Sequence, residues 1–182
     1  MSIQIFILSK LMQKDTYPYQ LKKGLSEPHY FAELIKMSES KLYYHFESLT
    51  KQGLIQVVEV IKEENRPDKQ VFRITDNGKQ QLPIKIYDQL KKAKSITDMV
   101  TSLSFLQFVD PTNVIEILTH KYNAVLEKQK KISKAKETLF STNTLEKRIP
   151  PILFVVEGYH QKQQQNELDT LLKLIENIQQ QI

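Results

Sequence analysis

Residues 38–54, SESKLYYHFESLTKQGL, have the pattern of a short helix that stops sharply. Its apolar side chains recur at helical spacing and share one face: Leu42, Phe46 and Leu49. Ser38 is a residue type that favours the N-cap, and Gly53 can adopt the left-handed backbone conformation that ends a helix. The stretch therefore predicts a helix over residues 38–52 with one buried apolar face.

The remaining surface of this helix is polar and carries two tyrosines. Its polar side chains are Ser40, Lys41, Tyr43, Tyr44, His45 and Ser48. Such groups can bond to base edges and phosphates, and a helix-turn-helix protein places a helix of this kind in the major groove of DNA. An ordinary amphipathic surface helix has the same pattern, and for His45 the alternative of an exposed or half-buried polar residue without a DNA contact is at least as strong. The stretch by itself leaves both interpretations open.

Short helical and extended segments flank this helix on both sides. Apolar spacing and proline positions predict helices over residues 3–13 and 19–25, and a further helical turn or two over residues 32–37 before the helix at 38–52. β-Branched residues predict two strands, residues 55–61 and 71–74, joined by a polar and charged tip. Three helices followed by a hairpin is the order of elements in a winged-helix domain.

The rest of the chain is helical by pattern. A helix over about residues 76–90 contains Pro83, which is expected to kink it or delay its start. Further helices are predicted over residues 96–108, from residue 110 to about 140, and at the C-terminus. The long helix has an apolar residue at every seventh position, Leu118, Val125, Ile132 and Leu139, and the last helix carries the stripe Leu168, Leu171, Ile175 and Ile178. Helices of this kind pack on another long helix, either in a second chain or in the same one.

Composition narrows the class of protein. The 182 residues include no cysteine, which excludes disulfides and cysteine-based zinc sites. The net charge is +5, with 13 basic and 11 acidic residues in 1–90 and 13 and 10 in 91–182, so basic charge is not concentrated in either half. The start of the chain does not resemble a signal peptide, and no apolar run reaches membrane-spanning length, so a cytoplasmic protein without membrane contact is expected.

Motifs for enzyme chemistry are missing from the sequence. The four glycines are isolated, so there is no phosphate-binding loop, and the four histidines lack metal-ligand spacing. Scattered carboxylates give no catalytic pair that the sequence can identify. We therefore expect neither an enzyme nor a bound cofactor or metal.

Several short fragments, in order, carry a family resemblance. They are residues 19–23 (YQLKK), 41–43 (KLY), 52–55 (QGLI), 65–69 (NRPDK) and 72–75 (FRIT), followed by Gly78. The chain resembles the PadR family of transcriptional regulators, in its larger type with a long helical C-terminal half. Pro18 and Tyr44 depart from the family's usual glycine and proline, so its base preference cannot be carried over to this chain.

The resemblance implies a mainly α-helical fold with a small β-hairpin, divided into a winged-helix DNA-binding domain, 1–90, and a helical dimerisation domain, 91–182. The expected partners are double-stranded DNA with an inverted-repeat operator and a second copy of the chain. The expected DNA contacts are Ser38, Ser40, Lys41, Tyr43, Tyr44, His45 and Ser48 on the helix, and Arg66 and Lys69 on the wing. Leu168, Leu171, Ile175 and Ile178 are the expected dimer contacts.

The resemblance also implies a small-molecule effector between the two halves. The candidate lining residues are Tyr19, Phe154, Tyr159 and His160, although Tyr159 and His160 fit ordinary packing equally well. The chain has no tryptophan, which excludes a ligand stacked between indoles. The predicted function is a homodimeric, sequence-specific repressor; the alternative is a helical partner-binding or ligand-binding protein whose winged helix does not recognise DNA.

Overall fold

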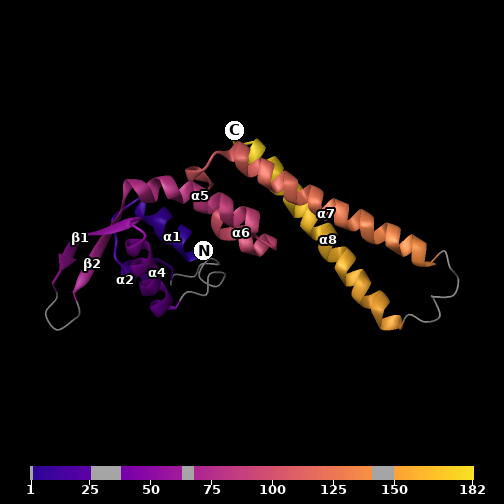
Figure 1. The fold of residues 1–182 in the computed structure, drawn as a ribbon, viewed down its shortest axis with the longest axis horizontal. Coiled ribbons are helices and arrows are strands. Elements are labelled where there is room, and N and C mark those ends of the chain that lie inside the picture. Colours follow the sequence, from indigo (N-terminus) through magenta and orange to yellow (C-terminus); the bar gives the residue numbers. More distant parts are fainter. Residues whose placement is uncertain (1, 26–37, 63–67, 141–149) are drawn as a thin grey trace. The chain divides into compact units, whose positions relative to one another are not determined.

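The computed structural model describes residues 2–25, 38–62, 68–140 and 150–182, which form two compact units. The first unit is Met1–Asp110 and the second is Pro111–Ile182 (Figure 1). The sequence predicted a division between residues 90 and 91. The first unit extends further because helix α6 (Ile96–Leu103) packs on the N-terminal helix and on α5, so it belongs to the core of that unit.

The first unit has the element order expected of a winged helix. Its elements are α1 (Ser2–Leu11), α2 (Pro18–Leu25), α4 (Glu39–Lys51), β1 (Ile55–Ile61), β2 (Lys69–Ile74), α5 (Asp76–Lys92), α6 (Ile96–Leu103) and a 3₁₀ turn, η1 (Leu106–Phe108). The predicted helix over residues 32–37 lies outside the described residues. The fold class predicted from the sequence, mainly α-helical with one antiparallel hairpin, is confirmed.

Helix α1 forms the centre of the first unit. Its side chains are buried on nearly every face: Ile5, Phe6, Ile7, Leu8 and Leu11. It contacts α4, α5, α6 and β2, which surround it, while the hairpin and α6 lie at opposite ends of the unit (Figure 1). This position explains why the apolar face of the helix is so wide in the sequence.

Helix α4 ends in a tight junction with the hairpin and α5. Gly53 has a φ of 67°, the left-handed conformation predicted for it. The Thr75 hydroxyl donates to the Gly53 carbonyl at 2.7 Å and accepts the Gly78 N–H at 3.0 Å, so one side chain caps α5 and holds it against the end of α4. The hairpin pairs Ile55 with Ile74 and contains a bulge near Val57.

Two local predictions turn out differently. The helix expected over residues 96–108 is broken: α6 ends at Leu103 and η1 begins at Leu106. Phe105 leaves the helical conformation with a φ of −126° and a ψ of 34°, and its buried ring lies 6.2 Å from that of Phe6. Helix α5 begins at Asp76 and includes Pro83, so of the two effects expected of this proline the delayed start is wrong.

The second unit consists of two long helices, α7 (Pro111–Phe140) and α8 (Pro151–Gln179). They run side by side in opposite directions (Figure 1). Their buried side chains are Val114, Leu118, Leu168, Leu171, Ile175 and Ile178. An ion pair between Lys136 and Glu157 joins them nearer the other end. No described helix is both long and apolar enough to span a membrane.

The close packing of Gly78 against the end of α4 gives a test of this junction. A Cβ atom on Gly78 would lie 2.1 Å from the Leu54 carbonyl oxygen and 2.7 Å from Cγ1 of Ile74. We expect Gly78→Ala to lower the free energy of unfolding by about 1–3 kcal/mol, because either α5 or the strand must move. Chemical denaturation measures the change.

Gly158→Ala is the matched control, since a Cβ atom there meets nothing within 4 Å. This helical substitution should be neutral or stabilise the protein by roughly 0.5–1 kcal/mol. A Gly78→Ala protein as stable as the wild type would contradict the observed junction.

Candidate nucleic-acid interface

Helix α4 is anchored on one face and exposed on the other. Leu42, Phe46 and Leu49 are at most 1% exposed and pack in the contacts that α4 makes with α1, α2 and β1. The Phe46 ring lies 4.9 Å from that of Phe72 on β2. The apolar face predicted from the sequence is therefore the face that attaches the helix to the unit.

Four of the predicted DNA contacts lie on the exposed surface of α4: Ser40, Lys41, Tyr43 and Tyr44. Tyr44 is 66% exposed and Tyr43 is 45% exposed, so both side chains can reach a partner outside the unit. A tyrosine combines a stiff aromatic body with a hydroxyl that both donates and accepts hydrogen bonds. This face can therefore form hydrogen bonds to a polar partner.

Ser38 serves the helix itself. Its hydroxyl accepts the Lys41 backbone N–H at 3.4 Å, as an N-cap does, and lies 3.3 Å from the Ser40 hydroxyl. The cap fixes where α4 begins and where the first exposed residues of the helix lie. Ser38 is exposed, so a contact outside the unit remains a prediction.

His45 and Ser48 point toward the rest of the unit more than the sequence suggested. His45 is half-buried, its Nδ1 has no hydrogen-bond partner among the described residues, and its ring packs 5.4 Å from that of Tyr44. Burial lowers the pKa of His45, and the charge of Lys41 lowers it further. The Ser48 hydroxyl accepts bonds from Gln4 on α1 at 3.4 Å and from Gln52 at 3.0 Å.

Lys51 is a further candidate contact on α4, in addition to the residues that the sequence predicted. Lys51 is exposed, seven residues after Tyr44 and eleven after Ser40, so the three side chains lie on one face of α4. The spacing of Ser40, Tyr44 and Lys51 in the sequence could have identified Lys51 as part of this face. Glu47 is exposed on the same side of the helix and reduces its positive charge.

Two cations of the hairpin, Lys69 and Arg73, have partners within the unit. The Lys69 ammonium lies 5.5 Å from the centroid of the Tyr17 ring. Arg73 forms a bidentate ion pair with Asp15, with Nη2 2.6 Å from Oδ2, and this hydrogen bond holds the pKa of Asp15 below its usual value. Arg66 lies outside the described residues.

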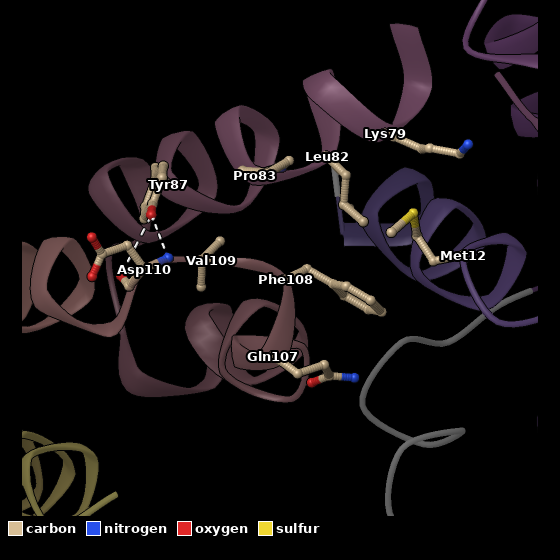
Figure 2. A pocket seen from close by; sticks show the side chains of 9 residues that line it. All are labelled: Met12, Lys79, Leu82, Pro83, Tyr87, Gln107, Phe108, Val109 and Asp110. Atoms are coloured by element: carbon tan, nitrogen blue, oxygen red, sulfur yellow. Dashed lines mark hydrogen bonds between the residues drawn. The ribbon is translucent and has the colours of Figure 1, made fainter. Parts of the chain in front are cut away.

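The first unit has an open cavity of about 410 Å³ beneath α5 (Figure 2). It is lined by Met12, Lys79, Leu82, Pro83, Tyr87, Gln107, Phe108, Val109 and Asp110. The Tyr87 hydroxyl accepts the Asp110 N–H at 2.8 Å and donates to the Asp110 carbonyl at 3.4 Å, as the dashed lines in Figure 2 show. A second cavity of about 340 Å³ between α7 and α8 is lined mainly by polar side chains, including four glutamines.

The predicted effector residues line neither of these cavities. Tyr19 is exposed on α2 of the first unit, while Phe154, Tyr159 and His160 are exposed on α8 of the second. Tyr159 and His160 contact each other, with ring centroids 5.7 Å apart. In the part of the chain that the structure describes, no group of three or more potential metal ligands occurs.

The lowered pKa of His45 predicts how stability depends on pH. Folding favours the neutral imidazole, so the unfolded chain binds more protons as the pH falls through the ordinary histidine value of about 6.5. The contribution of His45 to stability is therefore present above that pH and lost below it. Urea denaturation should show that the free energy of unfolding falls less between pH 7.5 and pH 5.5 in His45→Gln than in the wild type.

His120→Gln, an exposed substitution on α7, controls for the loss of one imidazole. An unchanged pH dependence in His45→Gln would show that the observed environment of His45 is wrong.

Comparisons with known proteins give a family match and a set of similar solved structures. Residues 7–83 match the model of the transcriptional regulator PadR-like family. No curated protein matches the chain. Among solved structures, a PadR family regulator from Clostridium difficile R20291 is 25% identical over 48% of this chain and 86% of its own, with a TM-score of 0.39.

Other similar structures cover almost the whole chain. Bacillus subtilis PadR, in complex with operator DNA, is 17% identical over 98% of this chain and 99% of its own, with a TM-score of 0.38. The protein smu.1604c from Streptococcus mutans UA159 is 18% identical over 98% and 96%, with a TM-score of 0.42. The resemblance to the PadR family that the sequence indicates is confirmed over residues 7–83 by the family match.

Proposed function

We propose that this protein is a cytoplasmic, homodimeric transcriptional repressor that binds DNA through α4. The observation that carries the proposal is the two-sided character of this helix: its apolar face is fixed in the core and its opposite face presents exposed hydroxyl, aromatic and amine groups. The match of residues 7–83 to a family of transcriptional regulators supports it. The proposal assigns the protein no catalytic activity.

The exposed residues of α4 divide into two roles. Ser40 and Tyr44 lie on the outermost face, where hydroxyl groups can bond to base edges in a major groove. Lys41 and Lys51 are exposed cations near the two ends of the helix, where they can bond to phosphates and fix its register. The wing residue Lys69 would contact the neighbouring backbone or minor groove after leaving the Tyr17 ring.

Two copies of this helix are needed for tight binding. Along α4, Lys41 and Lys51 are balanced by Glu39 and Glu47, so the electrostatic attraction of one unit for DNA is weak. Joining two weak half-sites raises the overall affinity without any new contact. This favours an inverted-repeat operator bound by a dimer with a two-fold axis.

In our proposal, the second copy of the chain contacts the first half of α8. The residues expected at the dimer contact, Leu168, Leu171, Ile175 and Ile178, are already buried within one chain. By contrast, an apolar cluster near the start of α8 is 44–68% exposed: Ile152, Leu153, Phe154, Val155, Val156 and Tyr159. Five consecutive residues cover the whole circumference of a helix, so α7 alone cannot bury them, and exposed apolar patches of this kind mark interaction sites.

We assign the small-molecule effector of this proposal to the cavity beneath α5. Its volume of about 410 Å³ lies in the range of ligand sites, and most of its walls are apolar. Residues 107–110 line it and lead directly into α7, so a ligand there touches the segment that connects the DNA-binding unit to the dimerisation unit (Figure 2). Relief of repression would follow from displacing that segment.

DNA binding is tested with duplexes selected from a random pool by the purified protein. We expect an inverted repeat whose half-site centres lie about 10 base pairs apart or a multiple of that. Inserting about five base pairs between the half-sites should abolish tight binding, because the second half-site then faces the opposite side of the duplex. Inserting about ten should partly restore binding, because the second half-site returns to the same side.

Lys51→Ala should reduce the slope of log affinity against log salt by about 1.

Lys92→Ala on α5 is the control for the loss of one charge. A protein that binds all spacings equally, or shows no dependence on salt, would support the alternative of a winged-helix protein that does not recognise DNA.

Dimerisation is tested at the apolar cluster of α8. Val155, which is 68% exposed, is replaced by glutamate, because a buried and unpaired carboxylate should prevent association. We expect Val155→Glu to be a folded monomer in sedimentation equilibrium and to lose tight operator binding. Ile182→Glu, at a 73% exposed apolar residue outside the cluster, should remain a dimer; a dimeric Val155→Glu protein would contradict the proposed interface.

A further inference from the structure

Four polar side chains form a closed ring of hydrogen bonds that joins three helices. Gln4 on α1 donates through Nε2 to the Ser48 hydroxyl on α4 at 3.4 Å. Gln52, the C-cap of α4, donates to the same hydroxyl at 3.0 Å. Lys85 on α5 closes the ring by donating to Oε1 of Gln4 at 3.3 Å and to Oε1 of Gln52 at 3.4 Å.

The ring has a defined direction. Each glutamine uses its amide nitrogen toward Ser48 and its amide oxygen toward Lys85, so turning either amide over would set its N–H donors against the Lys85 ammonium and break that bond. The ammonium of Lys85 has donors only, and the two amide oxygens are the acceptors that face it. The ring therefore depends on a donor at Lys85.

Lys85 is in an unusual setting for a lysine on this surface. It is half-buried, and burial lowers its pKa although Asp88 acts in the opposite direction. Its hydrogen-bond partners are neutral amides and not a carboxylate. Partial burial of a cation without a bonded counter-charge costs folding free energy, so stability alone does not account for this residue.

The ring contacts α4 on a side of the helix that its buried apolar residues do not cover. Leu42, Phe46 and Leu49 fix the inner face of the helix, whereas Ser48 and Gln52 lie on its flank in the last turn. A helix held on two different faces cannot roll about its own axis. Ser48 is one turn beyond Tyr44, so a small roll at the ring would move the exposed face that carries Tyr44.

We propose that Lys85 is a positioning residue for DNA recognition: through Gln4 and Gln52 it fixes the roll of α4, and so sets base discrimination without touching DNA. This inference rests on the proposed function. It also gives Ser48 a role in holding the helix, in place of the base contact expected from the sequence.

The test compares Lys85→Met with Lys92→Met, which removes the same charge from an exposed site on the same helix. Affinity for the selected operator and for an unrelated duplex is measured over a salt series. For Lys85→Met we expect the ratio of the two affinities to fall roughly tenfold, with the salt slope unchanged. A salt slope smaller by about 1 would show that Lys85 contacts a phosphate. An unchanged ratio of the two affinities would show that Lys85 has no role in base discrimination. Either result overturns the proposal.

A second measurement does not depend on DNA. Backbone hydrogen exchange at residues 52–54 should be faster in Lys85→Met and unchanged in Lys92→Met, because the end of α4 is no longer held. Lys85→Arg, which keeps a cationic donor, should restore slow exchange and the affinity ratio. If the wild type selects no operator, the proposed function fails, while the exchange result still decides whether the ring holds α4.

If Lys85→Met does not fold, Gln4→Leu breaks the same ring from α1 and should give the same changes. Faster exchange with an unchanged affinity ratio would show that the ring holds the helix but does not set discrimination, which also overturns the proposal.

Discussion

The burial of α1 is the constraint on which the first unit depends. Ile5, Ile7 and Leu8 have no exposed surface, and the helix contacts α4, α5, α6 and β2. A helix surrounded in this way supplies apolar surface to every neighbour, so each neighbour needs only one apolar face of its own. The amphipathic pattern of α4 follows from that geometry, and it leaves the outer face of α4 available for another molecule.

The sequence predicted the elements whose pattern is local. Leu42, Phe46 and Leu49 gave the correct buried face of α4, and Gly53 gave its end, because spacing and backbone conformation are local properties. The break after Leu103 could not be predicted from local pattern, since Phe105 leaves the helix to pack against Phe6 almost a hundred residues earlier. Tertiary contacts decided that boundary.

The residues of the candidate site on α4 could be predicted from the sequence, but the directions in which their side chains point could not. Tyr43 and Tyr44 were expected to be exposed and are, whereas the bonds from Gln4 to Ser48 and the burial of His45 depend on α1 and could not be inferred from α4 alone. The apolar stripe of α8 shows the same limit. Periodicity revealed that Leu171 and Ile175 would be buried, but not that α7 of the same chain takes part in burying them.

The charge distribution of the first unit explains why DNA recognition would depend more on the placement of side chains than on electrostatic attraction. Arg73 is held by Asp15, Lys69 lies beside Tyr17, and Glu47 shares the outer side of α4 with the lysines. Because carboxylates offset the charge of Arg73 and of the α4 lysines, binding to any random duplex gains less from counterion release. Discrimination would then fall on side chains that must be placed accurately, such as Tyr44, and the polar ring that we propose fixes the roll of α4 would act through that placement.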